Sequence, residues 1–124
     1  MWHNYLLKAA GAVAIGIALY HGFVGDAAIT ALEVNPAEQI EFLRSTFQLG
    51  TMGWIAGGIL LMAAGGFASQ QARNWIVGVF GFIYGFPAVG AFLMTGGRFD
   101  ISWVGLGLAV VLAVAGRKIP KAAV

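Results

Sequence analysis

Residues 25–48, GDAAITALEVNPAEQIEFLRSTFQ, form the one long polar stretch of this chain. They separate an apolar run at residues 5–24 from a second one at residues 49–68. Each run has roughly the 20 residues that an α-helix needs to cross a hydrocarbon core about 30 Å thick. The polar stretch therefore marks the place where the chain returns to water between two membrane-spanning helices.

Two further apolar runs, residues 75–94 and 101–116, follow after short polar segments in which Asn74 and Asp100 are suitable helix caps. Such short connections favour neighbouring helices that run in opposite directions. The chain has 124 residues, of which 60% are hydrophobic and only 10% charged, and this composition is typical of a membrane protein. The sequence predicts an all-α fold, in which residues 1–124 form one antiparallel four-helix transmembrane bundle.

The second half of the polar stretch predicts an amphipathic extension of the second helix. Asn35 is a good cap, Pro36 suits the first helical position, and Glu38 follows three residues after the cap. Apolar residues then recur at i, i+3 and i+7, with polar residues on another face. No breaker separates this segment from the next apolar run, so we expect one helix from Pro36 to about Ala68, unless a glycine bends it.

Charged residues divide unequally between the two sides of the predicted bundle. If both termini lie on one side, that side carries most of the basic residues, namely Lys8, Arg73, Arg117, Lys118 and Lys121. The opposite side carries all the acidic residues, namely Asp26, Glu33, Glu38, Glu41 and Asp100. The positive-inside rule therefore predicts cytoplasmic termini and an extracytoplasmic segment at residues 25–48. We expect a multi-pass protein of a bacterial inner (plasma) membrane.

Small residues recur along the apolar runs at the spacing of one helix face. In lipid, such residues let helix backbones approach closely. We expect the following residues to pack against other helices: Ala10, Ala14, Ala18, Gly22, Gly53, Gly57, Gly81 and Gly85. Pro87 predicts a kink in the third helix, because it lacks an amide donor and clashes with the preceding turn.

Several classes of function are excluded by what the sequence lacks. It has no cysteine, which excludes disulfides, iron–sulfur ligation and cysteine-zinc sites. Neither the phosphate-binding G-x-x-x-x-G-K-[ST] pattern nor H-E-x-x-H occurs. The basic residues form no continuous stripe, so a nucleic acid is not an expected partner. We identify no catalytic set of residues, and we expect a non-enzymatic protein without a bound metal or resident cofactor.

His21, near the end of the first span, is the strongest candidate for binding a ligand. An imidazole at this depth can ligate haem or a pigment, relay a proton, or hydrogen-bond a quinone. The alternative is an interfacial histidine bonded to water or to a loop carbonyl. Because His3 belongs to the other side, a bis-histidine haem is not expected. Asp26 can reach His21 only if Gly22 and Gly25 bend the helix, and otherwise it caps a short surface helix.

Three more polar residues are candidates for binding. Arg44 lies three residues after Glu41 and four before Gln48, so it forms a solvated salt bridge or, with Gln48, binds an anionic headgroup or a partner subunit. Tyr84 either offers its hydroxyl to a ligand in a central cavity or bonds a backbone carbonyl that Pro87 leaves free.

Two short segments invite comparison with a known group, Tyr20-His21-Gly22 at the end of the first span and Leu43-Arg44-Ser45 before the second. In these segments, and in its layout of four spans with an extracytoplasmic first loop, the chain resembles the small bacterial four-helix membrane proteins of the DoxX-like group. The resemblance implies a four-helix membrane fold and accessory status, since members of the group are described as subunits of respiratory or redox assemblies or have no assigned role.

Three functions are compatible with these observations. The first is an accessory or assembly subunit that lies among membrane lipids and packs against transmembrane helices of other subunits or of a homo-oligomer. The second is the binding or transport of a lipophilic ligand, such as a quinone, a pigment or a lipid, at His21, Gln48 and Tyr84. The third is a membrane redox subunit in which His21 is an axial ligand of haem.

Overall fold

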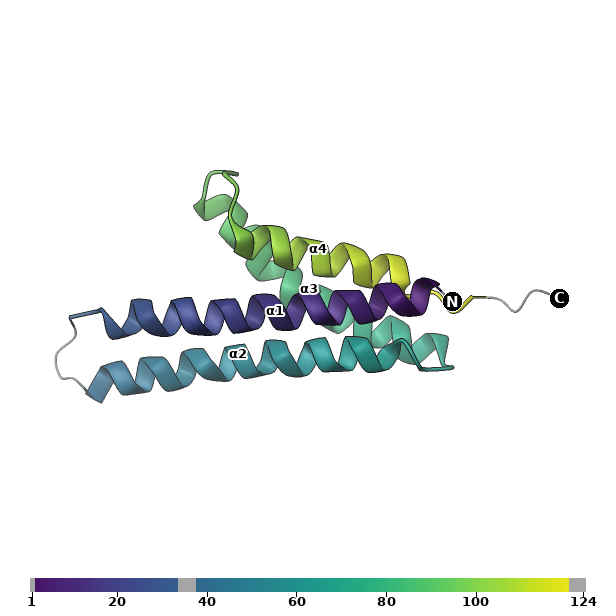
Figure 1. The fold of residues 1–124 in the computed structure, drawn as a ribbon, viewed down its shortest axis with the longest axis horizontal. Coiled ribbons are helices and arrows are strands. Elements are labelled where there is room, and N and C mark those ends of the chain that lie inside the picture. The colour runs from purple at the N-terminus through teal and green to yellow at the C-terminus, as the bar shows by residue number, and fades with distance from the viewer. Residues whose placement is uncertain (1, 34–37, 121–124) are drawn as a thin grey trace.

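The computed structural model describes residues 2–33 and 38–120, and these residues form four α-helices (Figure 1). The helices are α1 (Trp2–Thr30), α2 (Glu38–Ala64), α3 (Gln70–Met94) and α4 (Ile101–Gly116). No strand occurs within the described residues. The predicted all-α, four-helix class is therefore confirmed.

Three of the helices, α1, α2 and α3, are long and apolar enough to cross a membrane. They have 29, 27 and 25 residues, so each exceeds about 30 Å at about 1.5 Å per residue. The fourth helix, α4, has 16 residues and is about 24 Å long. Its bounds agree with the predicted ones, and the carboxylate of Asp100 accepts a hydrogen bond from the Ser102 amide at 2.8 Å, which confirms the predicted cap.

Helix α1 packs along α2 and against α4. The third helix, α3, packs mainly against α4 and less extensively against α2. In Figure 1, α2 returns beside α1, whereas the turn between α3 and α4 diverges from α1. We call the end where α1 begins and α4 ends the near end, and the end that holds the turns after α1 and after α3 the far end.

The buried core lies at the near end and in the middle of the molecule. Its fully or almost fully buried hydrophobic residues are Leu7, Ala10, Ala14, Ile17, Ala18, Leu61, Ala64, Val77, Tyr84, Leu106, Ala109 and Ala113. In the described part of the chain, no residue is buried between Gly22 of α1 and Thr51 of α2, or between Tyr84 of α3 and Gly105 of α4. The far end therefore consists of two helix pairs that bury little between them.

Arg73 is a buried cation at the near end, with only 2% of its surface exposed. Its Nε donates to the Phe67 carbonyl at 3.0 Å, and one terminal nitrogen donates to the Gly65 carbonyl at 3.0 Å and to Asn4 Oδ1 at 2.7 Å. The other terminal nitrogen reaches the Lys118 carbonyl at 3.5 Å. One guanidinium thus joins the start of α1, the turn after α2 and the segment after α4.

The helix bounds differ from the predicted ones in α1 and α2. The first helix continues through Gly25 to Thr30, so the interpretation of Asp26 as the cap of a separate surface helix is wrong. Gly25 is a contact residue here, because a Cβ at this position would overlap the ring of Phe47. The second helix is continuous from Glu38 and ends at Ala64 rather than near residue 68.

The predicted cap of the third helix is also wrong. Ser69 caps α3, since its hydroxyl accepts a hydrogen bond from the Ala72 amide at 3.2 Å, and Asn74 lies inside the helix. Ser69 is as good a cap as Asn74, so the sequence alone did not separate them. The predicted cap Asn35 and the first-turn residue Pro36 lie outside the described residues.

Candidate functional site

The contact between α1 and α2 is built on glycine and alanine. A Cβ added at Gly11 would overlap the Gly58 carbonyl oxygen, and one added at Gly22 would lie 2.9 Å from Thr51 Cγ2. These positions have no room for a larger side chain, because the two backbones approach closely along this line. The sequence reasoning missed Gly11, although it lies seven residues before Ala18 on the same face.

The predicted packing residues fall into two groups. Ala10, Ala14, Ala18, Gly22 and Gly57 are buried within the chain. The other three are Gly53, Gly81 and Gly85, where an added Cβ would meet no atom of the described residues within 4 Å. None of these three glycines is therefore in close contact with another of the four described helices.

Gly53 belongs to a face of α2 that changes its environment along the helix. At Gly57, an added Cβ would overlap the Phe80 ring and approach the Tyr84 hydroxyl of α3. Gly50 and Gly53 precede Gly57 by seven and four residues, so they lie on the same side of α2. No described atom lies within 4 Å of a Cβ at either position, because α3 has diverged there.

Asp26 of α1 and Arg44 of α2 form a bidentate ion pair at the far end. Arg44 Nε donates to Asp26 Oδ1 at 2.9 Å, and a terminal nitrogen donates to Oδ2 at 3.2 Å. The predicted pair between Arg44 and Glu41 is also present, at 3.1 Å. The structure therefore makes Asp26 the main partner of Arg44, across the helix interface.

This ion pair lies beyond the apolar runs 5–24 and 49–68, where water screens it. Hydrogen bonds from Arg44 hold the pKa of Asp26 below its ordinary value, and the carboxylate in turn raises the pKa of Arg44. Both side chains are about one third exposed. Exposed pairs of this kind contribute little to stability, so we expect the pair to add little to the free energy of folding.

Gln48 lies one turn of α2 beyond this pair. Its amide nitrogen donates to the Gly22 carbonyl at 3.2 Å. Beside it is a cavity of about 300 Å³ whose wall is mostly apolar but includes the polar side chains of Asp26, Gln48 and Thr51. Of the predicted binding residues, the structure thus brings Asp26, Arg44 and Gln48 together.

His21 is enclosed by aromatic rings instead. Its ring stacks on Phe47 with centroids 4.4 Å apart, and lies 4.7 Å from the Trp54 ring. Its Nδ1 is buried and has no hydrogen-bond partner among the described residues. The described part of the chain shows no hydrogen bond between His21 and Asp26, because the unbroken helix places them five residues apart; the alternative in which a bend at Gly22 and Gly25 brings them together is therefore wrong.

Tyr84 is fully buried where α3 meets α2. Its hydroxyl donates to the Trp54 carbonyl at 2.7 Å, so the acceptor belongs to α2 and is not a carbonyl released by Pro87. Trp54 therefore contacts both His21 and Tyr84. The hydroxyl is engaged in fixing α3 to α2, and Gln48 is bonded to Gly22 elsewhere, so the three predicted ligand-binding residues do not converge on one site.

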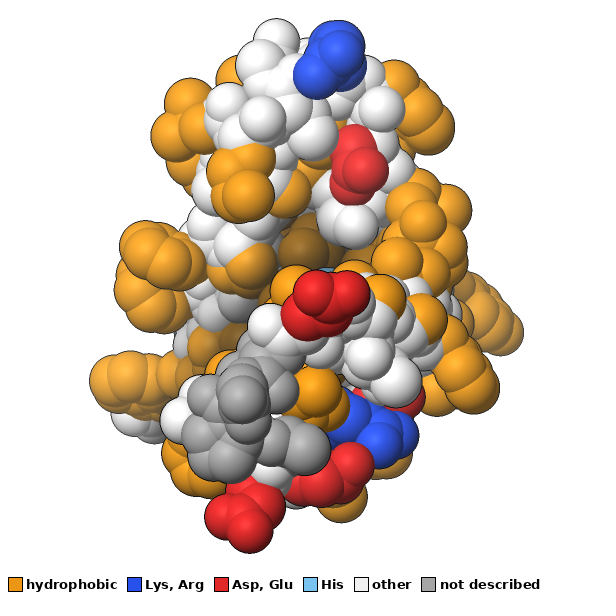
Figure 2. Space-filling model, turned by 90° about the vertical axis from the view of Figure 1, so that its left-hand side faces the viewer, with side chains coloured by type: hydrophobic (Ala, Val, Ile, Leu, Met, Phe, Trp, Pro, Cys, Tyr) orange, Lys and Arg blue, Asp and Glu red, His pale blue; other side chains and the backbone are white. Residues whose placement is uncertain are grey.

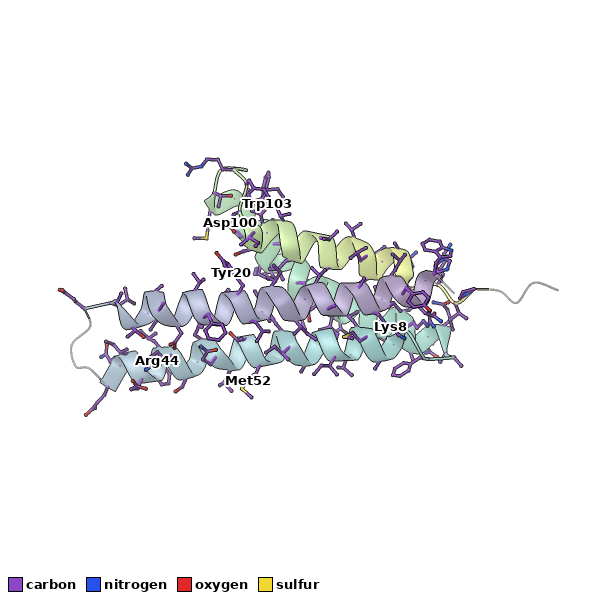
Figure 3. The ribbon with its side chains drawn as sticks, in the orientation of Figure 1. Lys8, Tyr20, Arg44, Met52, Asp100 and Trp103 are labelled. Atoms are coloured by element: carbon purple, nitrogen blue, oxygen red, sulfur yellow. The ribbon has the colours of Figure 1, made fainter. Side chains whose placement is uncertain are left out.

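The far end also has an open side. Figure 2 shows a hollow between the α3–α4 turn and the ends of α1 and α2, with acidic side chains on both parts. In Figure 3, Tyr20 points from α1 toward the side where α4 lies, while Asp100 and Trp103 lie at the start of α4. The hollow agrees with the absence of buried residues in this part of the described chain.

No group of three or more potential metal ligands occurs among residues 2–33 and 38–120. No family model, curated protein or solved structure matches the chain. The function must therefore be argued from the site itself, and above all from the open face of α2.

Proposed function

We propose that the protein is a non-enzymatic integral membrane subunit that packs against a transmembrane helix of a partner subunit. The observation that carries this proposal is the face of α2 on which Gly57 contacts α3, while Gly50 and Gly53 meet no described atom. The same surface is thus used for close helix packing in one place and left open a turn or two away.

The physics of helix association in lipid supports this assignment. Lipid tails are as apolar as leucine side chains, so helices associate through close van der Waals packing rather than through the hydrophobic effect. Glycines that face lipid contribute nothing to such packing and cost about 1 kcal/mol of helix propensity each relative to alanine. An apolar partner helix that packs on Gly50 and Gly53 can approach the backbone of α2 as closely as α3 does at Gly57.

The membrane placement is part of the proposal. The lengths of α1, α2 and α3 and the composition of the chain favour it. We infer an antiparallel bundle with α4 as a short fourth span, cytoplasmic termini, and the far end on the outer side of a bacterial inner membrane, because the acids gather at the far end. A DoxX-like relationship fits the same layout and stays a proposal.

Bulky substitution on the open face provides the test. A Cβ at Gly53 meets no described atom within 4 Å, so with Gly53→Leu the subunit should keep its helix content and lose its partner. Gly16→Leu is the matched control, because Gly16 is exposed on α1 and also has open space around it. Native mass spectrometry of the detergent-extracted protein measures the partner's mass on wild type and both variants.

The results for Gly53→Leu and Gly16→Leu together support or contradict the proposal. Loss of the partner in Gly53→Leu alone supports the proposal, and a lost mass that is a multiple of 13.0 kDa identifies the partner as a second copy. An assembly that survives Gly53→Leu, or that is equally lost in Gly16→Leu, contradicts the use of this face.

A second candidate function is the binding of a lipophilic ligand, such as a quinone or pigment, at His21. The observation in its favour is the buried, unpartnered Nδ1 between two aromatic rings. Here His21→Ala should release the ligand while membrane insertion is unchanged, and His3→Ala at the near end is the control. An absorption spectrum of the same sample distinguishes haem or pigment, with His21 as axial ligand, from a quinone or a lipid. Full retention of the ligand by His21→Ala rules out this site.

A further inference from the structure

Two cavities of about 480 and 390 Å³ adjoin between α3 and α4 at the near end. They share Asn74 of α3 and Arg117, which directly follows α4. Volumes of this size are typical of sites that hold small molecules. We call the two cavities together the near-end groove.

The near-end groove is apolar in its depth and polar at its mouth. The deep part is lined by Val77, Gly78 and Gly81 of α3 and by Val110 and Val114 of α4. An added Cβ on either glycine would meet no described atom within 4 Å, so the groove runs directly over the backbone of α3. The mouth is formed by Gln70, Asn74, Arg117, Lys118 and Ile119.

Gln70 gives the mouth a fixed shape. Its amide nitrogen donates to Asn74 Oδ1 at 2.9 Å and to the Arg117 carbonyl at 2.8 Å, and its oxygen accepts from the Ile119 amide at 2.8 Å. The segment after α4 is therefore tied to the first turn of α3. This attachment holds the backbone of Arg117 and Lys118 beside the opening of the groove.

The charged side chains at the mouth of the near-end groove are all basic. Arg117 and Lys118 are exposed, and neither forms an ion pair within the described residues. The described acidic residues belong to the far end, where both recorded ion pairs also lie. An anion at the mouth therefore meets two cations and no competing carboxylate of the described chain.

The dimensions match a lipid that stands in a bilayer. Asn74 and Gly81 are seven residues apart, so the groove extends about 10 Å along α3 from its polar mouth. A headgroup lies at the interface and an acyl chain lies directly below it, and basic pockets between transmembrane helices recognise anionic headgroups in this way. We propose that the near-end groove binds an anionic phospholipid, with its phosphate at Arg117 and Lys118 and an acyl chain over Gly78 and Gly81. This inference is independent of the partner-helix face on α2.

The headgroup part is tested by native mass spectrometry of the purified protein, titrated with dioleoyl phosphatidylglycerol or with dioleoyl phosphatidylcholine. We expect about 30-fold tighter binding of the phosphatidylglycerol, since each cation near an anionic headgroup contributes about fivefold. The double variant Arg117→Gln/Lys118→Gln should bind the two lipids equally. Lys8→Gln, which removes an exposed near-end cation outside the groove, should keep the preference. Equal binding by wild type, or an unchanged preference in the double variant, overturns the proposal.

The acyl-chain part needs its own variant. Gly81→Leu fills the deep groove without changing a charge, and should weaken the binding of phosphatidylglycerol at least about tenfold, by removing the space for the chain. Gly90→Leu is the control, because Gly90 also has open space but does not line the groove. Full competition by inorganic phosphate together with unchanged binding by Gly81→Leu identifies a site for a free anion and overturns the lipid assignment.

Discussion

The near end and the far end of this molecule are built from the same four helices but are held together very differently. The near end contains buried apolar residues together with the buried Arg73, whose guanidinium is bonded to three separate segments of the chain. At the far end, the described residues bury almost nothing between the two helix pairs, and the main polar contact is the screened pair of Asp26 and Arg44. The near end therefore contains more of the buried contacts that stabilise the fold, and the far end leaves more of its helix surfaces uncovered.

Glycine shows why composition alone does not reveal this division. Gly11 and Gly53 lie in similar apolar surroundings in the sequence, and both are helical. A Cβ at Gly11 would overlap the Gly58 carbonyl oxygen, whereas one at Gly53 would meet nothing described. The difference depends on which neighbour reaches each helix face, and that is a property of the fold.

Arg73→Leu should give the largest loss of stability. It removes the donors for the Phe67 and Gly65 carbonyls and for Asn4, and each buried acceptor left unpaired costs about 1–3 kcal/mol. We expect the free energy of unfolding, measured by SDS titration in mixed micelles, to fall by about 3 kcal/mol or more.

The matched control for Arg73 is Arg98→Leu at the far end. Arg98 is exposed, and its side chain donates one hydrogen bond, to the Thr95 carbonyl at 3.1 Å. We expect a change below about 1 kcal/mol, as for most surface substitutions. Equal losses in the two variants would show that the near end is not the more stable half.

Gly11→Ala and Gly53→Ala should have opposite signs. The added methyl group at Gly11 forces α1 and α2 apart, and overpacking of this kind costs about 1–3 kcal/mol. At Gly53 the methyl group has open space, so the better helix propensity of alanine should add up to about 1 kcal/mol. Thermal unfolding of both variants in the same detergent measures the two shifts, and a common sign would contradict the comparison.

Tyr84→Phe tests the boundary between the two halves. It removes the hydrogen bond to the Trp54 carbonyl while it keeps the ring, so we expect a loss of about 1 kcal/mol in the SDS titration. Tyr20→Phe is a control on an exposed tyrosine of α1 and should change nothing measurable. A loss as large as that of Arg73→Leu would place the main stabilising contact at the boundary instead.

The smallest expected effect is the pH dependence of the stability that the Asp26–Arg44 pair contributes at the far end. The pKa of Asp26 is lower in the folded state than in the unfolded state, chiefly because of hydrogen bonds from Arg44. The pair therefore stabilises the fold fully above the ordinary carboxyl pKa of about 3.9, and this contribution is lost as the pH falls through the lower folded value.

Comparison of wild type with Asp26→Asn isolates this contribution. The difference in Tm between them should be small at about pH 6 and should shrink as the pH falls through the lowered pKa of Asp26, because the carboxylate then becomes protonated. Glu33→Gln, which alters an exposed acid of the same end, should show no such convergence. A difference that persists in acid would mean that Asp26 acts through packing rather than charge.

Those parts of the fold that depend on nearby residues were predictable from the sequence. The cap at Asp100 and the bounds of α4 follow from a cap residue directly before an apolar run. The buried alanine face of α1 follows from its four-residue spacing. The start of the third helix was harder to predict, because Ser69 and Asn74 are both good caps. Only the position of the turn after α2 makes Ser69 the cap.

The site required contacts between residues far apart in the chain. Asp26 and Arg44 are separated by eighteen positions, and their pairing depends on the register of α1 against α2. The binding of Arg73 to Asn4 and Lys118 depends on the closing of the whole bundle, and no local pattern indicates it. The hypothesis that His21 pairs with Asp26 failed for the opposite reason, since it relied on a local bend that packing against Phe47 prevents.

The Arg73 contacts also bear on the order of events during synthesis. Asn4 is made first, Gly65 and Phe67 near the middle, and Lys118 last among the partners of this guanidinium. When only α1, α2 and α3 have been synthesised, the guanidinium of Arg73 and three of its four acceptors are already present. The fourth acceptor, the Lys118 carbonyl, is still missing because Lys118 follows α4. The set of hydrogen bonds that Arg73 makes is thus completed only late in translation, after α4 has been made.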